Sequence, residues 1–241
     1  MSRPAEFPVH LVRHGQTSSY EGDSGLTGRG QRQASARARS LGEILSDGER
    51  VGVVHAPTER ARLTAAAMRS ELIAAAGESG RSVRIGPLRE EPGFANVTVR
   101  VDGRAWEPTQ VRAEHRRLVA QADPPGWVTE ASRFWQADEA PGGAMGFWLT
   151  TPLLWHESPA SVVHRTLLSA SRYARADDAP DRLLVSTHAG CLRALVAWAA
   201  GADMGEPDNA EEVTLLLLAG DHVSITFRGR TWRARFPSRL P

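Results

Sequence analysis

The segment HLVRHGQTSSYEGDSGLTGRGQRQA, residues 10–34, joins a short apolar run to a glycine-rich helix start. The apolar run ends in Arg13, His14 and Gly15, which places a guanidinium and an imidazole at the mouth of a buried strand. Burying either group without a partner is costly in free energy. The pattern therefore predicts a bound anion at this position, which His14 either holds or reacts with.

Length and composition exclude several classes of protein. A chain of 241 residues is long enough for one large α/β domain with a sizeable core. Its net charge of +1 argues against nucleic acid or an anionic membrane as a partner. Cys191 is the single cysteine, which excludes an intramolecular disulfide and suits a reducing compartment. The N-terminus lacks the pattern of a secretory signal, and no apolar run approaches the roughly 20 residues of a membrane span. We therefore expect a cytoplasmic protein.

Hydrophobic periodicity predicts alternating strands and helices. The alternation indicates βαβ units and a mostly parallel sheet with helices on both faces, a three-layer α/β/α sandwich. Turns at 220–221 and 229 add hairpins at the end of the chain and predict one antiparallel edge strand. The predicted strands are 7–14, 50–56, 82–86, 182–188 and those within 212–236, and the predicted helices are 26–48, 58–77, 158–176 and 189–201.

The segment from residue 94 to residue 156 interrupts this alternation. It is rich in Pro, Gly and Trp, and only residues 108–121 predict a helix. It is too long for a plain loop in a compact domain. We therefore expect one domain over residues 1–241 with an inserted cap, about 95–156, above the carboxyl ends of the strands, where open α/β sheets bind ligands. The tryptophans of the cap build either a small core of their own or the aromatic wall of a pocket.

Two predicted strands end in histidine. His14 follows the first strand and His188 a later one, and each is followed by a glycine-containing turn and a helix. Because the carboxyl ends of parallel strands meet at one sheet edge, we expect both imidazoles there, together with backbone N–H groups that bind anions. Arg13 and Arg60 add guanidinium groups that can donate paired hydrogen bonds to a phosphate or a carboxylate, and Arg60 lies near the start of the predicted helix 58–77.

These motifs together resemble the histidine phosphatase superfamily, the phosphoglycerate mutase-like family of branch 1 type. The matches run in family order from about residue 9 to residue 192, except across the cap. They are Arg13-His14-Gly15-Gln16-Thr17, the segment LTGRGQRQA at 26–34, the segment APTERARLTA at 56–65, Leu88-Arg89-Glu90, His156-Glu157-Ser158 with Arg165, and Ser186-Thr187-His188-Ala189-Gly190.

The resemblance implies a mechanism and a set of site residues. In such enzymes the first histidine attacks phosphorus, arginines and the second histidine surround the phosphoryl oxygens, and a carboxylic acid protonates the leaving oxygen. No metal and no cofactor is implied. Carried over to this sequence, the nucleophile is His14, the surrounding groups are Arg13, Arg60 and His188, the acid is Glu90, and the substrate-binding positions are Gly15, Gln16, Thr17, Ala189 and Gly190.

Departures from the family pattern shape the functional prediction. The segment SSYEGDSG, residues 18–25, replaces the Asn and the Gly-Trp pair usual in mutases, which favours a hydrolase. We therefore predict a metal-independent phosphatase acting on a small or medium phosphomonoester and releasing inorganic phosphate. The alternatives are a phosphoglycerate mutase, a protein that binds a phosphorylated ligand without hydrolysing it, and a pathway enzyme with non-hydrolytic chemistry. A homodimer is compatible with the sequence, which does not determine the oligomeric state.

Several assignments stay open at this stage. Glu90 has Glu91 beside it and lacks the family's following Gly-x-x-Glu-Gly pattern, so a non-catalytic Glu90 is an alternative. Gln16 and Thr17 either line the pocket or only form the turn. His55, at the end of the second strand, is either a core histidine or a pocket residue. The organic part of the substrate is not determined.

Overall fold

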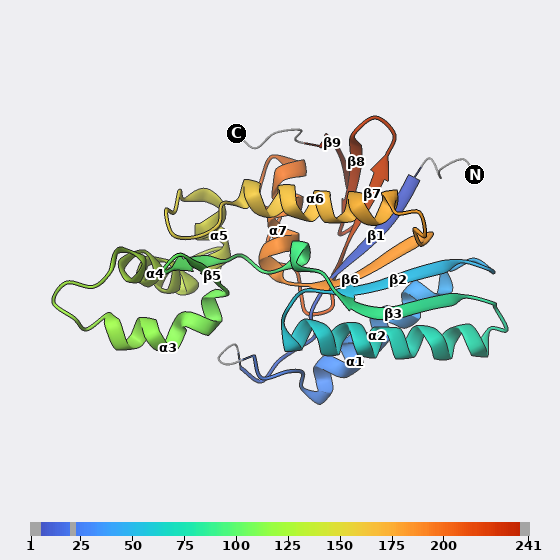
Figure 1. Ribbon diagram of the computed structural model, residues 1–241, viewed down its shortest axis with the longest axis horizontal. Coiled ribbons are helices and arrows are strands. Elements are labelled where there is room, and N and C mark those ends of the chain that lie inside the picture. The colour runs from blue at the N-terminus through green and yellow to red at the C-terminus, as the bar shows by residue number, and fades with distance from the viewer. Residues whose placement is uncertain (1–5, 20–22, 237–241) are drawn as a thin grey trace.

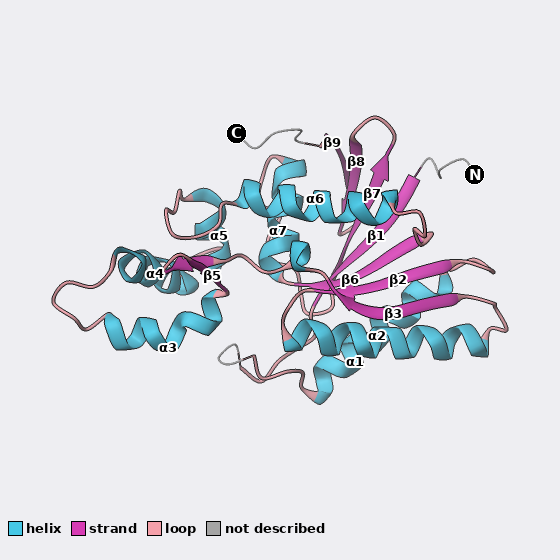
Figure 2. Cartoon of the chain, in the orientation of Figure 1, coloured by secondary structure: helices cyan, strands magenta, loops and turns pink. Residues whose placement is uncertain are grey.

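Four parallel strands form one half of the central sheet (Figures 1 and 2). The computed structural model describes residues 6–19 and 23–236, so the N-terminal pentapeptide and part of the segment SSYEGDSG lie outside the described residues. The sheet has seven strands in the order β3-β2-β6-β1-β7-β8-β9. Ser186 lies opposite both Val12 and His55, so the parallel strands end level with one another. These strands are β1 (Glu6–Arg13), β2 (Arg50–His55), β3 (Arg84–Glu90) and β6 (Arg182–Thr187).

The other half of the sheet is an antiparallel meander. It consists of β7 (Glu212–Leu218), β8 (His222–Phe227) and β9 (Arg230–Arg235), and β7 pairs antiparallel with β1. Both hairpin turns are left-handed at consecutive residues, with φ of 69° and 59° at Gly220 and Asp221 and of 49° and 72° at Arg228 and Gly229. The predicted fold class is therefore confirmed, and its antiparallel edge contains three strands rather than the one expected, because each predicted turn reverses the chain.

Two helices cover each face of the sheet. The helices α1 (Gly28–Glu43) and α2 (Glu59–Glu78) pack on one face over a cluster that includes Val12, Val53 and Leu184. The helices α6 (Pro159–Arg175) and α7 (Ala189–Ala200) cover the other face over a cluster that includes Val9, Leu11 and Val185. Neighbouring residues of one strand thus enter opposite cores, as the period of two in a strand requires. Among the described residues, no helix has the length and apolar character needed to cross a bilayer.

Side-chain caps fix where the helices begin. The Thr27 hydroxyl accepts from the Gly30 N–H at 3.0 Å, and the Ser158 hydroxyl accepts from the Ser161 N–H at 3.1 Å. The Thr58 hydroxyl accepts from the Ala61 N–H at 3.3 Å, so α2 begins one residue later than predicted. Each such cap stabilises its helix by about 1 kcal/mol.

The segment between β3 and α6 forms a layer of its own beside the sheet (Figure 1). It contains several helices and two short strands, where the sequence predicted a single helix. The short helices were missed because the Pro and Gly residues that bound them obscure their periodicity. Trp127 and Val128 form a separate small core with Val99, whereas Trp148 and Phe134 join the larger core below. The elements are η1 (Pro92–Phe94), β4 (Val99–Val101), β5 (Arg104–Trp106), α3 (Pro108–Leu118), α4 (Gly126–Gln136), η2 (Ala137–Glu139) and α5 (Gly143–Thr150).

A mostly buried polar chain runs diagonally across the sheet, from Glu49 just before β2, through Arg182 on β6 and His10 on β1, to Glu212 on β7. The Nη1 atom of Arg182 donates to Nε2 of His10 at 2.6 Å, which leaves Nδ1 of His10 to donate to Oε1 of Glu212 at 2.6 Å. The Nε atom of Arg182 donates to Glu49 at 2.6 Å, and the Thr214 hydroxyl donates to Glu212 at 2.8 Å. Burial opposes the charged form of Glu212, but the hydrogen bonds from His10 and Thr214 hold its pKa below the ordinary value.

We expect Glu212→Gln to lower the free energy of unfolding by about 1–3 kcal/mol at pH 7, because buried donors lose a charged acceptor. A carboxyl with a lowered folded pKa contributes stability above its unfolded pKa of about 4.3 and loses it as the pH falls further. Urea unfolding should therefore show a smaller difference in the free energy of unfolding between wild type and Glu212→Gln at pH 4 than at pH 7. The exposed Glu43→Gln variant is the control. A difference that did not depend on pH would contradict the role of the Glu212 charge.

Candidate active site

The ends of β1 and β6 bring two imidazoles together. His14 and His188 follow these strands directly, and the centroids of their rings lie 5.2 Å apart at an angle of 62°. His14 is 2% exposed and His188 is 1% exposed. Arg60, in the first turn of α2, is also 1% exposed, and its Nη2 lies 3.4 Å from Nδ1 of His188. The structure thus confirms that the three residues lie close together at one edge of the sheet.

The hydrogen bond of His14 fixes its tautomer. Nδ1 of the ring lies 2.8 Å from the Gly15 carbonyl oxygen, and since a carbonyl can only accept, Nδ1 carries the proton. Nε2 of the neutral ring then keeps its lone pair. Burial first, and then the charges of Arg60 and Arg13, lower the pKa of His14 from 6.5 to about 3, although the bond to Gly15 opposes this shift. The ring is therefore neutral and nucleophilic at Nε2 over the whole physiological range of pH.

His188 has the opposite tautomer. Its Nδ1 accepts from Arg60, so in the neutral ring Nε2 carries the proton and donates to the Thr58 hydroxyl at 3.2 Å. Burial, followed by the charges of Arg60 and His14, holds the pKa of His188 well below its ordinary value. His188 also precedes α7, so the backbone N–H groups of that helix start lie beside it.

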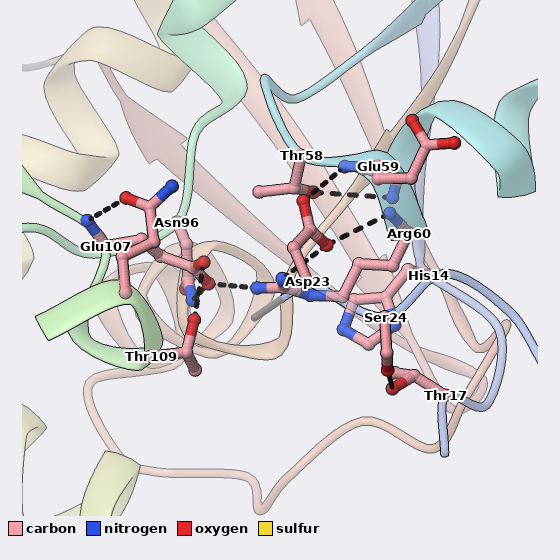
Figure 3. A network of polar contacts seen from close by, with 12 residues as sticks. His14, Thr17, Asp23, Ser24, Thr58, Glu59, Arg60, Asn96, Glu107 and Thr109 are labelled. Atoms are coloured by element: carbon pink, nitrogen blue, oxygen red, sulfur yellow. Dashed lines mark hydrogen bonds and ion pairs between the residues drawn. The ribbon is translucent and has the colours of Figure 1, made fainter. Parts of the chain in front are cut away.

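The buried guanidinium of Arg60 binds two carboxylates (Figure 3). Nη1 donates to Oδ1 of Asp23 at 2.9 Å, and Nη2 donates to Oε1 of Glu107. Asp23 also accepts from the backbone N–H groups of Glu59 and Arg60 and so fixes the start of α2. Glu107 accepts from Asn96 Nδ2 and from the Thr109 hydroxyl, each at 2.8 Å. Sequence reasoning missed Asp23, Asn96 and Glu107; the one available signal was Pro108, typical of a first helical position, which marks Glu107 as a helix start.

Arg13 enters the site from the last position of β1. Its Nη1 donates to the Pro207 carbonyl and forms an ion pair of 2.9 Å with Glu206. Glu206 also lies 3.8 Å from Nη1 of the buried Arg193. Glu206, another residue missed from the sequence, lies in the irregular segment between α7 and β7, which carries no motif.

A cavity of about 160 Å³ contains the predicted arginines and histidines. Its other residues come from the cap, from the start of α7 and from the loop before β7, so the cap forms the wall opposite the strand ends. A larger cavity of about 590 Å³ lies along β2 and β3 and contains neither histidine. The smaller cavity is lined by Arg13, His14, Arg60, Asn96, Pro108, Thr109, Arg112, Phe134, Trp135, Asp138, Ala144, Met145, His188, Ala189, Gly190 and Glu206.

The remaining predicted site residues divide into two groups. Ala189 and Gly190 line the cavity, whereas Gln16 and Thr17 lie outside its described lining. Gln16 is bonded to α1, since its N–H donates to Gln33 Oε1 and its Oε1 accepts from the Thr27 hydroxyl, and the Thr17 hydroxyl donates to the Ser19 carbonyl. Glu90 is exposed at the end of β3 and is likewise absent from the described lining. His55 is buried, and its Nδ1 donates to the Ala56 carbonyl at 2.8 Å, as expected for a core histidine. Of the five residues with predicted catalytic roles, the structure brings together all but Glu90.

Two glycines bring the turn after β1 against the start of α1. A Cβ atom on Gly15 would lie 2.4 Å from the Gly30 carbonyl oxygen, and one on Gly30 would lie 2.2 Å from the Gln16 carbonyl oxygen. The Gly15 N–H donates to the Thr64 hydroxyl at 3.0 Å, which ties the same turn to α2. The glycines of the first two motifs are therefore required by a backbone contact that positions His14.

Comparisons with known proteins agree with this site. The model of the histidine phosphatase superfamily (branch 1) matches residues 9–78, which include His14 and Arg60. The resemblance to the histidine phosphatase superfamily is confirmed. No curated protein matches the chain.

Two solved structures share the fold. A Bacillus stearothermophilus protein, YhfR, is 19% identical with a TM-score of 0.55, over 92% of this chain and 96% of its own. A phosphoglycerate mutase from Bacillus anthracis is 14% identical with a TM-score of 0.55, over 93% of both chains. At these identities the likeness shows the fold alone.

Gly30→Ala should destabilise the protein by about 1–3 kcal/mol, because the added methyl group forces the turn away from α1. Gly28→Ala is the matched control on the same helix, since its Cβ would meet only Arg32 Nη1 at 3.6 Å. Urea unfolding of the two variants tests this. Equal free energies of unfolding for Gly30→Ala and Gly28→Ala would mean that the turn at Gln16 can move to accommodate a methyl group on residue 30.

The ring of His14 should stay neutral from pH 8 to pH 5, because a base with a pKa of about 3 binds no proton in that range. Nitrogen-15 NMR of the histidine rings, assigned with a His14→Asn variant, should show a protonated Nδ1 and an unprotonated Nε2 throughout. A titration near pH 6.5 would show instead that solvent or a nearby anion stabilises the imidazolium.

Proposed function

We propose that this protein is a metal-independent phosphatase that hydrolyses a small or medium phosphomonoester through a phosphohistidine on His14. The observation that carries the proposal is the tautomer and place of His14: Nδ1 donates to the Gly15 carbonyl, so the neutral ring has its lone pair at Nε2, and His14 lines a cavity together with Arg13, Arg60 and His188. Such a ring is arranged to attack an anionic electrophile, because burial and the nearby arginines keep it neutral.

In the proposed reaction, Nε2 of His14 attacks phosphorus and the bond to the leaving oxygen breaks. The negative charge of the transition state spreads over the other phosphoryl oxygens, which Arg13, Arg60 and His188 surround. Water then attacks the phosphohistidine and releases inorganic phosphate. Covalent catalysis thereby divides one difficult displacement into two easier ones.

The arginines supply the positive charge that a metal ion provides in other phosphatases. Within the described residues, no group of three or more His, Cys, Asp or Glu side chains could hold a metal ion. We infer that residues 1–241 act as one unit in which the insertion, residues 95–156, covers the phosphoryl site. The cavity of about 160 Å³, with Trp135 and Phe134 in its wall, suits a phosphomonoester with a compact, partly apolar organic group.

The first experiment is hydrolysis of a panel of phosphomonoesters by EDTA-treated protein, with wild type beside His14→Ala. The panel comprises p-nitrophenyl phosphate, 3-phosphoglycerate, sugar phosphates, nucleotides and phosphoamino acids. We expect EDTA-resistant turnover that is lost in His14→Ala, and a rate about 10²–10³-fold lower in Arg60→Lys, because lysine cannot reproduce the fork. The exposed His222→Ala variant is the control.

Other outcomes would point to the alternative functions. Turnover retained in His14→Ala would contradict the phosphohistidine, and turnover lost with EDTA would contradict metal independence. Isomerisation of 3-phosphoglycerate without phosphate release would identify a mutase. Binding of these esters without turnover would identify a ligand-binding protein.

A further inference from the structure

We propose that Glu107, at the start of cap helix α3, is the carboxyl group that protonates the leaving oxygen. This inference rests on the proposed phosphatase function and names a residue outside the matched motifs. It replaces the role that the sequence assigned to Glu90 at the end of β3.

Contacts on both oxygens hold the Glu107 side chain against Arg60, beside the cavity residues Asn96 and Thr109. It is 8% exposed, and Oε1 accepts from Arg60 Nη2 and from Asn96 Nδ2, the latter at 2.8 Å. Its Oε2 accepts from the Thr109 hydroxyl at 2.8 Å. The backbone N–H of Glu107 donates to Gln110 Oε1 at 3.2 Å, which fixes the start of α3. A carboxyl group that is to transfer a proton in a defined direction needs this degree of positioning.

The direction of attack places the leaving oxygen on the side of the cap. In an in-line displacement, the attacking nitrogen and the leaving oxygen lie on opposite sides of phosphorus. The strand ends supply His14 on one side of the cavity, and Pro108 and Thr109, which directly follow Glu107, line the other. Figure 3 shows the Arg60 guanidinium between the His14 ring and the Glu107 carboxylate. A phosphoryl group bound to Arg60 would therefore lie within reach of both residues.

A bound phosphoryl group would change the contacts of Glu107. Arg60 Nη2 now donates to Glu107, and a phosphoryl group bound at Arg60 would compete for that donor.

Other carboxyl groups near the cavity are less suited to this role. Asp23 lies in the loop after β1 and not in the cap, and its carboxylate accepts from Arg60 Nη1 and from two backbone N–H groups at the start of α2. The Glu206 side chain is 45% exposed and pairs with Arg13. Asp138 is exposed, and the Ala144 N–H at 3.5 Å donates to it. Glu107 combines burial, a position in the cap and contact with Arg60.

The two proposed steps balance in protons and electrons. In the first, Nε2 of His14 forms a bond to phosphorus, the P–O bond breaks, and the Glu107 proton passes to the leaving oxygen to give an alcohol. In the second, the Glu107 carboxylate takes a proton from water as the water oxygen bonds to phosphorus. The P–N bond then breaks, its electron pair returns to Nε2, and phosphate leaves.

The test is the rate of alcohol release in the first turnover by wild type, Glu107→Gln and Glu90→Gln. Two substrates are compared: p-nitrophenyl phosphate, whose leaving group needs no proton, and the alkyl phosphomonoester that the wild type hydrolyses fastest. We expect Glu107→Gln to slow alkyl alcohol release about 10²–10⁴-fold, the usual contribution of a general acid, and p-nitrophenol release far less. With p-nitrophenyl phosphate, Glu107→Gln should also accumulate acid-labile phosphohistidine, because the second step lacks its base.

Matched variants separate chemistry from structure. Glu90→Gln should leave both rates close to wild type, and Glu107→Asp should recover part of the alkyl-ester rate that Glu107→Gln loses. Equal losses on both substrates in Glu107→Gln would overturn the proposal and make Glu107 a residue that only positions Arg60. A selective loss in Glu90→Gln would return the role to Glu90. A wild type inactive on every ester would overturn the proposed function itself, without reference to any variant.

Discussion

Burial of the Arg60 guanidinium is the constraint on which the site depends. An isolated buried cation is unfavourable by several kcal/mol, so partners must come to it. Asp23 arrives from the loop after β1 and Glu107 from the cap, and both bind a side chain in the first turn of α2. Three segments far apart in the sequence therefore meet at one charge. Removing either carboxylate would leave that charge partly unpaired and would detach a segment that encloses the cavity.

Burial and the same charge together keep the two histidines neutral. Burial contributes most to the lowered pKa of each ring, Arg60 adds to it, and Arg60 also donates directly to His188. The two tautomers differ: His14 has its lone pair at Nε2, whereas His188 donates from Nε2 to the Thr58 hydroxyl and accepts at Nδ1 from Arg60. The His14 ring is arranged to attack and the His188 ring is held between Arg60 and Thr58, although both are neutral. This difference arises from the hydrogen bond that each Nδ1 makes, and not from a difference in charge.

The sequence predicted well those parts of the site that the sheet topology determines. Arg13, His14 and His188 lie at the ends of buried parallel strands, so the pattern of apolar runs alone places them at one edge. The backbone contact between Gly15 and Gly30 was not predicted, although both glycines lie in the first two motifs. The structure of the cap could not be predicted to this extent, because short helices bounded by Pro and Gly show too few turns for a period to emerge. Glu107 acquires its place through a tertiary contact with Arg60, and Asn96 through a contact with Glu107, and neither contact leaves a local signal.

Glu90 illustrates why a matching motif does not by itself place a side chain. Its strand, β3, is separated from β1 by β2 and β6, so the two backbones lie about 14 Å apart at the usual strand spacing. No glutamate side chain spans that distance, so the chain that follows the strand must carry a carboxylate inward. Here that chain turns at once into η1, where Glu91 accepts from the Gly93 N–H and from Arg172 and so faces α6. Residues of the cap line the same cavity as the strand-end residues Arg13, His14 and His188 and have no such distance to cross. A carboxylate from the cap can therefore reach Arg60 where one from β3 does not, and the chemistry of the site depends on the inserted segment as much as on the sheet.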